Sequence, residues 1–302
     1  MKIVLLGKDG KLGSAIFAKL VDNYDVIGFN KKELDITDSR KLKKELLQIF
    51  PDIIINAAAY TDVDNSEVSK EKALKVNSEA LNAIIESALI INSCLIHFST
   101  DYVFDGTKNN SYIEDDRVNP LNFYGFSKRK GEELIINSKC KFLIFRLSTI
   151  IGGYNNNIIY KIIDNACNNK KILMINDQYL TPTSVDFVSR NISSTIKKII
   201  NKDLSTRNIY HLSPNGFTTP YLLATKLFNL FNNITDKKHL HIKNINQLSH
   251  EEYFNEVRRP KNCILNSSKF FEDSGQIYPN WEYEYQEFAE KILTRFVQEN
   301  LN

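Results

Sequence analysis

Residues 3–13 read IVLLGKDGKLG, an apolar run followed at once by three glycines, Gly7, Gly10 and Gly13. The apolar side chains of residues 11–21 then recur with helical spacing. Glycines between a strand and a helix allow a tight turn and let the backbone approach a pyrophosphate closely. The N-terminus of such a helix also offers free N–H groups to phosphate. The segment therefore predicts a dinucleotide-binding βα unit.

Short apolar strands and helices continue to alternate up to about residue 150. We predict strands at 3–7, 25–29, 52–57, 94–99 and 141–147, and helices at 11–21, 39–50, 67–91 and 124–137. This alternation is typical of a parallel sheet covered by helices on both faces. We expect a further helix at 184–201 and a strand at 208–212, followed by helices at 220–232 and 284–299 among irregular segments.

The expected fold class is therefore α/β, a Rossmann-type doubly wound parallel sheet with a smaller C-terminal α/β lobe that binds substrate. Residues 1–147 are expected to form the NAD(P)-binding domain, to which residues 184–212 return. Residues 148–183 and 213–302 are expected to form the smaller lobe.

Composition excludes several classes of protein. The 302 residues are 42% hydrophobic and carry 39 basic and 36 acidic side chains, a net charge of +3. This near balance argues against a nucleic-acid partner, and no run approaches the ~18 apolar residues of a membrane span. The four cysteines fit neither a zinc nor a disulfide pattern, and His239 with His241 lacks a third metal ligand. We expect a cytoplasmic protein that binds a small molecule and holds no metal.

The loop after the second strand bears on the choice of cofactor. Enzymes specific for NAD usually place a carboxylate there on the ribose 2′-hydroxyl. This chain has Asn30 followed by Lys31 and Lys32, which favours the 2′-phosphate of NADPH, while NADH stays open. Asp35 and Ile36 are expected to contact the adenine.

Two further motifs carry side chains suited to proton transfer. Tyr124 and Lys128 lie four residues apart in the predicted helix 124–137, so the phenol and the ammonium share a face. Thr100 follows the strand 94–99, at the edge where open α/β sheets bind ligands. We expect Tyr124 to protonate a carbonyl oxygen to which Thr100 donates a hydrogen bond. Lys128, helped by an oxidised nicotinamide, should lower the pKa of Tyr124 from about 10 and hold the nicotinamide ribose.

These motifs resemble a known family. The GxxGxxG spacing is similar to that of extended short-chain dehydrogenases/reductases, and a longer series of segments resembles the dTDP-4-dehydrorhamnose reductase family. The segments that carry this resemblance are residues 7–13, 56–64, 99–106, 120–125, 146–148, 177–178, 181–183, 210–212 and 258–260. They span nearly the whole chain.

The resemblance implies NAD(P)H-dependent reduction of the 4-keto group of a nucleotide 6-deoxy-4-hexulose, with dTDP-4-dehydro-L-rhamnose favoured. Its product, dTDP-L-rhamnose, is a precursor of cell-surface polysaccharides such as the lipopolysaccharide O-antigen. The implied cofactor contacts are Gly7, Gly10, Lys11, Leu12, Gly13, Asn30, Asp35, Ile36, Ala57, Ala58, Ala59, Tyr60, Asn77, Tyr124 and Lys128. The implied substrate contacts are Thr100, Asp101, Thr149, Asp177, Gln178, Arg258 and Arg259, with the arginines suited to a diphosphate.

Two departures from the family pattern keep alternatives open. The family usually has a tryptophan where this chain has Thr149, and Phe-Gly where it has Tyr179-Leu180. The sugar and the nucleotide therefore stay open, as does another nucleotide-sugar reductase or epimerase. A 4,6-dehydratase is disfavoured because Asp101 is followed by Tyr102 and not by the second carboxylate of that class. A non-catalytic regulatory subunit like that of methionine adenosyltransferase, and assembly as a homodimer, also stay open.

Overall fold

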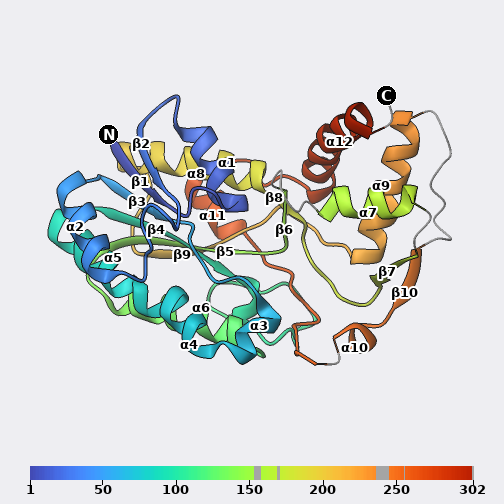
Figure 1. Cartoon of the computed structure of the whole chain (residues 1–302), viewed down its shortest axis with the longest axis horizontal. Coiled ribbons are helices and arrows are strands. Elements are labelled where there is room, and N and C mark those ends of the chain that lie inside the picture. The colour runs from blue at the N-terminus through green and yellow to red at the C-terminus, as the bar shows by residue number, and fades with distance from the viewer. Residues whose placement is uncertain (153–157, 169–170, 236–244, 255, 301–302) are drawn as a thin grey trace.

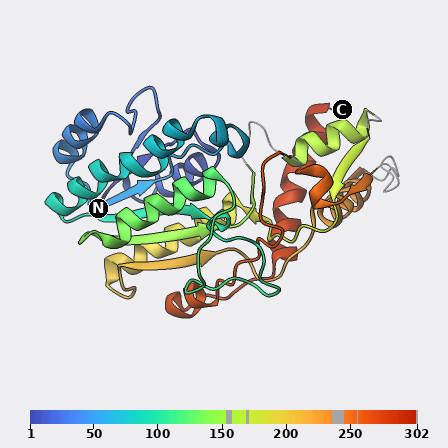
Figure 2. The ribbon, with the colours of Figure 1, turned by 90° about the horizontal axis from the view of Figure 1, so that it is seen from below.

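The computed structural model describes residues 1–152, 158–168, 171–235, 245–254 and 256–300. The chain forms two groups of elements that lie side by side along the long axis of the molecule (Figures 1 and 2). The larger group contains the N-terminus and a six-stranded sheet, and the smaller one contains the last helix. Within the described residues, no helix has both the length and the apolar character needed to cross a bilayer.

The six-stranded sheet is parallel throughout. Its strands are β1 (Lys2–Leu6), β2 (Asp25–Phe29), β3 (Ile53–Asn56), β4 (Cys94–Thr100), β5 (Lys141–Leu147) and β9 (Asn208–Leu212). The order β2-β1-β3-β4-β5-β9 reverses direction between β1 and β3. In an open parallel sheet, ligands bind outside the carboxyl ends of the strands at this reversal. The predicted strands and the predicted fold class are confirmed.

Helices cover both faces of the sheet (Figure 1). Ile3 and Leu5 point to the face covered by α1 (Lys11–Leu20), α8 (Val185–Asn201) and α11 (Ser268–Ser274). Val4 and Leu6 point to the opposite face, covered by α2 (Ser39–Ile49), α5 (Ala80–Ile91) and α6 (Phe123–Asn137). This alternation is what a strand buried on both sides requires. Helix α11 adds its phenylalanines to the core of the larger group, although it follows much of the smaller group in sequence.

The predicted single helix 67–91 is wrong. The chain instead forms α3 (Val63–Val68), a break at Ser69, α4 (Lys70–Leu74), a π-helical turn (Lys75–Glu79) and then α5. The backbone of Ser69 leaves helical geometry, at φ −102° and ψ 49°. The π-helical turn carries Asn77 against α6, where a Cβ on Gly131 would clash with the Asn77 carbonyl oxygen. Such turns recur at functional sites, and apolar spacing alone does not reveal them.

The smaller group packs three helices over two short parallel strands. Its members are α7 (Ile158–Cys167), β7 (Ile172–Ile175), α9 (Pro220–Thr235), β10 (Ile245–Leu248), α10 (His250–Tyr253) and α12 (Trp281–Asn300). A second pair of strands, β6 (Ile150–Ile151) and β8 (Thr183–Ser184), lies between the two groups (Figure 1). The predicted helices at 220–232 and 284–299 are confirmed as parts of α9 and α12. His239 and His241 lie outside the described residues.

Candidate active site

The end of β4 presents two buried polar side chains. Thr100 Oγ1 donates a hydrogen bond to Asp101 Oδ1 at 2.9 Å, and it accepts one from the Tyr102 N–H at 3.2 Å. Ser148, which follows β5, donates to Asp101 Oδ2 at 3.3 Å. Thr100 is 7% exposed and Asp101 4%. The Asp101 carboxylate therefore lies between the hydroxyls that follow two neighbouring strands.

Helix α6 is held against this strand end by its own N-terminus. Asn122 caps the helix by accepting the Gly125 N–H at 2.9 Å, and Glu67 of α3 accepts the Phe123 N–H at 2.7 Å. A Cβ on Gly125 would clash with the Tyr102 carbonyl oxygen, so only glycine permits this approach. The first turn of α6 thereby brings the Tyr124 side chain close enough to Thr100 for the two to interact.

Burial raises the pKa of Tyr124 to about 12, with a smaller contribution from the Asp101 carboxylate, while the hydrogen bond with Thr100 lowers it. The lowering that we expected from Lys128 is absent. Lys128 Nζ turns instead toward β4 and donates to the Phe98 carbonyl oxygen at 2.6 Å. Tyr124 therefore carries its proton at neutral pH.

Burial also raises the pKa of Asp101 to about 7, although hydrogen bonds from Thr100 and Ser148 lower it. We expect this shift to appear in the stability of the fold. The folded protein binds the Asp101 proton more tightly than the unfolded chain, whose value is near 3.8. The contribution of this proton to the free energy of unfolding is therefore largest below pH 4 and is lost as the pH rises through about 7. The loss is at most about 1.4 kcal/mol per pH unit.

Urea unfolding of the wild type and of Asp101→Asn between pH 4 and pH 8 tests this prediction. The free energy of unfolding of the wild type should fall relative to the variant across this range. A difference between the two proteins that does not change with pH would contradict it.

Lys128 lies in a buried polar row that the sequence analysis did not anticipate. Its Nζ is 3.3 Å from Nε2 of His97 on β4, and His97 Nδ1 is 3.2 Å from the side-chain nitrogen of Asn56 on β3. The three side chains are 1–2% exposed. One signal for this row was present, because His97 lies within the apolar part of β4 and Asn56 ends the apolar run of β3.

The glycine loop lines a cavity of about 470 Å³, the loop pocket. Of the predicted cofactor contacts, the loop pocket is lined by Gly7, Gly10, Asn30, Asp35, Ile36, Ala57, Ala58, Ala59 and Tyr60. Gly7 has a φ of 83°, and a Cβ there would lie 2.7 Å from the Ala58 nitrogen. Helix α1 begins next to the loop, and no side chain caps its N-terminus. A pocket with a glycine cradle and uncapped N–H groups fits a dinucleotide.

Lys11, Leu12 and Asn77, also predicted as cofactor contacts, are not among the lining residues of the loop pocket. Leu12 packs on the core of the larger group, and the Lys11 side chain lines a separate groove between α1, α8 and α12. Asn77 accepts the Tyr60 N–H at 2.8 Å and donates to the Tyr60 carbonyl oxygen at 2.9 Å. It also donates to Ser127 of α6 at 2.9 Å. Asn77 therefore joins the wall of the loop pocket to the helix that carries Tyr124.

The residues predicted to favour NADPH over NADH, Asn30, Lys31 and Lys32, lie at the rim of the loop pocket. Asn30 donates to Asp9 at 2.8 Å and accepts the Lys32 N–H at 2.9 Å, which fixes its side chain. Lys31 and Lys32 line the same pocket, and Lys31 lies 3.9 Å from Asp35. The two ammonium groups give the rim a positive character that Asp9 and Asp35 offset in part.

Replacing Gly13 by alanine should weaken NADPH binding by at least about tenfold, since an added Cβ would clash with the Gly7 carbonyl oxygen. Ser14→Ala is the matched control: Ser14 is exposed in the first turns of the same helix and is not among the lining residues of the loop pocket. Titration of NADPH by fluorescence checks both variants. An equal loss in the two would contradict the prediction.

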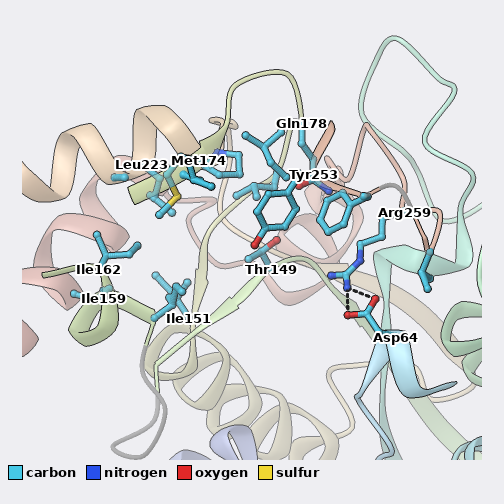
Figure 3. A pocket seen from close by; sticks show the side chains of 18 of the residues that line it. Asp64, Thr149, Ile151, Ile159, Ile162, Met174, Gln178, Leu223, Tyr253 and Arg259 are labelled. Carbon is cyan, nitrogen blue, oxygen red and sulfur yellow. Dashed lines mark hydrogen bonds and ion pairs between the residues drawn. The ribbon is translucent and has the colours of Figure 1, made fainter. Parts of the chain in front are cut away.

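A second pocket opens beside the first turn of α3 (Figure 3). Its inner wall is aliphatic and includes Ile151, Ile159, Ile162, Met174 and Leu223. Its polar lining residues include Glu256 and Tyr285. They also include Asp64, Thr149, Gln178, Tyr253 and Arg259, which Figure 3 shows on the side opposite the aliphatic wall. The pocket therefore combines a wide apolar surface with few polar groups, as sites for small organic ligands do.

Arg259 closes one side of this second pocket. Its Nη2 bonds both carboxylate oxygens of Asp64, at 2.7 and 2.8 Å, across the boundary between the two groups of elements. The guanidinium also lies 4.3 Å from the centre of the Phe254 ring. Its buried Nε has no hydrogen-bond partner among the described residues, so one donor is left for a ligand.

Not every predicted substrate contact reaches this pocket. Thr149, Gln178 and Arg259 line it. The predicted contacts that are not among its described lining residues are Thr100, Asp101, Asp177 and Arg258. Asp177 accepts the His250 N–H at 2.6 Å and pairs with Lys261 at 2.7 Å. Arg258 is exposed, and its carbonyl oxygen accepts from Asn122. Asp64 and Tyr253 line the pocket without having been predicted, since no local pattern marked them.

Comparison with known proteins places the chain in a family. Residues 1–294 match the family model described as RmlD substrate binding domain. The dTDP-4-dehydrorhamnose reductase of Sinorhizobium fredii is 31% identical over 283 residues, which are 93% of this chain and 94% of that protein. A crystal structure of a dTDP-4-dehydrorhamnose reductase from Clostridium acetobutylicum superposes with a TM-score of 0.86 at 28% identity, covering 97% of this chain and 99% of the other.

A dTDP-4-dehydrorhamnose reductase from Bacillus anthracis, solved in complex with NADP, has a TM-score of 0.82 and 29% identity, over 99% of both chains. These matches extend across the larger group, the smaller group and both pockets. The chain belongs to the dTDP-4-dehydrorhamnose reductase family.

Proposed function

We propose that this chain uses NADPH to reduce the 4-keto group of dTDP-4-dehydro-L-rhamnose, giving dTDP-L-rhamnose. One observation carries the proposal: hydrogen bonds join Tyr124 to both pockets. On one side, its carbonyl oxygen accepts from Ser127, which is bonded to Asn77 and thereby to the loop pocket. On the other side, its hydroxyl interacts with Thr100, which donates to Asp101. Asp101 in turn accepts from Ser148, the neighbour of Thr149 in the second pocket.

Reduction of a ketone needs a hydride at carbon and a proton at oxygen. NADPH, when bound in the loop pocket, supplies the hydride. Tyr124 gives its hydroxyl proton to the carbonyl oxygen, so that the product is a neutral alcohol. Thr100 holds the same oxygen by a hydrogen bond, and Asn77 keeps α6 in register with the loop pocket.

The second pocket is the proposed site of the nucleotide sugar. Arg259 contacts the diphosphate through its remaining donors, because a guanidinium matches phosphate oxygens with paired hydrogen bonds. Gln178 and Thr149 provide neutral polar contacts, and the aliphatic wall faces the less polar parts of the ligand. Thr149 is smaller than the tryptophan that the family usually carries, so this chain has more room beside the sugar.

The domains follow from the same assignment. We assign residues 1–147, 184–212 and the helix α11 to the cofactor-binding domain. Residues 148–183 and the rest of 213–302 form the substrate-binding lobe. We also propose that the protein acts in the cytoplasm as a homodimer. Ile90 of α5 and Phe126 of α6 are apolar and exposed. A second copy of the chain would bury these side chains away from water. Light scattering after size exclusion should then give twice the chain mass of 34.8 kDa.

The reaction is tested by mixing the purified protein with dTDP-4-dehydro-L-rhamnose, generated in place, and following the oxidation of NADPH and NADH separately. The proposal expects oxidation of NADPH that depends on the keto sugar, with NADH less effective because of Lys31 and Lys32. Cofactor binding without oxidation would reject this substrate and favour either another keto sugar admitted by Thr149 or a non-catalytic role.

A further inference from the structure

His97 has two buried neighbours that decide where its proton sits. Asn56 faces its Nδ1 at 3.2 Å, and Lys128 faces its Nε2 at 3.3 Å. All three side chains are within the sheet and α6, at 1–2% exposure. Water therefore does not offer these groups alternative partners, and their donors and acceptors must match each other.

The orientation of Asn56 follows from the backbone beside it. Its side-chain oxygen accepts the Ala58 N–H at 3.2 Å, so its amide nitrogen is the atom that faces His97. An amide nitrogen only donates, and His97 Nδ1 must therefore be the acceptor. Burial, with the Lys128 charge as a smaller cause, holds the pKa of His97 well below its usual value, so the ring is neutral. A neutral ring with a free Nδ1 carries its proton on Nε2.

This N–H points at Lys128. An ammonium group has three donors and no acceptor, so it cannot accept the His97 proton. A neutral amine has a lone pair that can. The Phe98 carbonyl oxygen accepts from Nζ at 2.6 Å in either form. His97 thus stabilises the uncharged form of Lys128 relative to the charged form.

The other groups around Lys128 do not cancel this preference. Burial lowers the pKa of Lys128 to about 8, and Glu132 one turn further along α6 acts in the opposite direction. The Glu132 carboxylate is bound by Arg146 of β5, at 2.9 Å from both Nε and Nη2. Tyr124, one turn before Lys128 on α6, is protonated and adds no charge.

We infer that His97 is a positioning residue of the reduction: Asn56 fixes its proton on Nε2, and this N–H makes Lys128 release its own proton more readily. The inference rests on the proposed function only for its effect on the reaction. The charged form of Lys128 is the one expected to hold the nicotinamide ribose, so loss of its proton sets the alkaline limit of activity. His97 sets the pH at which that limit falls.

The test measures protonation in the protein without cofactor or substrate. Nitrogen NMR of histidine-labelled protein should show the Nε2–H form of His97 at pH 7 and above. Carbon NMR of labelled lysine, with Lys128→Met to identify the signal, follows the titration of Lys128. An Nδ1–H form in the wild type would overturn the inference.

The variant His97→Phe keeps a ring of similar size and removes the N–H. The titration of Lys128 should then move up by about one pH unit. A move downward would mean that Nε2 accepts a hydrogen bond from Lys128, and no move would mean that His97 only fills space. Either result overturns the inference. The matched control is His211→Phe, another buried histidine on β9 whose Nδ1 bonds the Tyr112 carbonyl oxygen, and it should leave Lys128 unchanged.

A second variant keeps the test decisive if His97→Phe does not fold. Asn56→Asp has nearly the same shape, and its carboxylate still accepts the Ala58 N–H. In this variant a carboxylate oxygen, which accepts, replaces the amide nitrogen that donates to His97 Nδ1. His97 should therefore move its proton to Nδ1 and leave Nε2 free to accept from Lys128. We expect the NMR form of His97 to switch and the alkaline limit of keto-sugar reduction to rise. An unchanged Nε2–H form in this variant would contradict the inference, whereas absence of reductase activity in the wild type would reject the proposed function alone.

Discussion

Tyr124→Phe should lower kcat for keto-sugar reduction by about 10³-fold, because it removes the group that protonates the carbonyl oxygen. The ring itself is retained. It lies edge-on to Tyr102 with the ring centres 6.0 Å apart, so the packing at the start of α6 should survive. NADPH affinity should change little, since the pocket of the glycine loop is lined by other residues. The rate of NADPH oxidation and a fluorescence titration of NADPH measure the two effects.

Tyr102→Phe is the matched control for this prediction. Tyr102 is the neighbouring phenol, but its hydroxyl interacts with the Arg259 guanidinium and not with Thr100. Loss of the Tyr102 hydroxyl should weaken binding in the nucleotide-sugar pocket and raise KM, with kcat reduced less than about tenfold. A larger fall in kcat for Tyr102→Phe than for Tyr124→Phe would move the proton-donor role to Tyr102.

The local parts of the fold could be predicted because their signals are local. The strands of the large sheet are short apolar runs, and the glycine loop lies between the first strand and its helix. The same holds for Tyr124 and Lys128, whose spacing within one helix places them on one face whatever surrounds that helix. The sequence also indicated the end of β4 for Thr100, since a parallel sheet collects its ligands at that edge.

Contacts between distant segments could not be predicted in this way. Asp177 is next to Gln178 in the sequence, yet its carboxylate pairs with Lys261 while Gln178 lines the pocket. Arg258 and Arg259 likewise diverge, because Arg259 pairs with Asp64 at the second pocket while the Arg258 side chain is exposed. The pairing of β7 with β10 joins residues about 70 positions apart. No periodic pattern specifies such a pairing.

Electrostatic roles were the least accessible to the sequence. The spacing of Tyr124 and Lys128 suggested a cation beside a phenol, but the direction of a lysine side chain depends on the acceptors around it. Lys128 donates to the Phe98 carbonyl oxygen at 2.6 Å, and it is not among the groups that shift the pKa of Tyr124. A strand residue, His97, then faces the lysine, which the helix sequence alone could not indicate.

Glu132→Gln should lower the free energy of unfolding by about 3–5 kcal/mol, the cost of leaving one partner of a buried ion pair alone. Glu132 and Arg146 are joined by two hydrogen bonds of 2.9 Å, and their side chains are 0% and 2% exposed. A glutamine has one oxygen and no charge, so the guanidinium of Arg146 would stay buried without its counter-charge. Urea unfolding at pH 7 measures the effect.

Glu133→Gln, one residue further along α6, is the matched control. Glu133 pairs with Lys130 at 2.9 Å, but both side chains are at the surface, 36% and 45% exposed. The control should therefore lose no more than about 1 kcal/mol, as exposed pairs do. An equal loss in the two variants would mean that burial does not determine the value of the Glu132–Arg146 pair.

The pH dependence provides an independent check on the same pair. Burial raises the pKa of Glu132, but Arg146 and the hydrogen bonds to the carboxylate outweigh burial and hold it below the ordinary value of 4.5. The folded protein therefore binds the proton less tightly than the unfolded chain. The stabilisation is present above pH 4.5 and is lost as the pH falls through the lowered pKa. The difference between the wild type and Glu132→Gln should thus shrink under acid conditions, because a protonated Glu132 no longer neutralises Arg146.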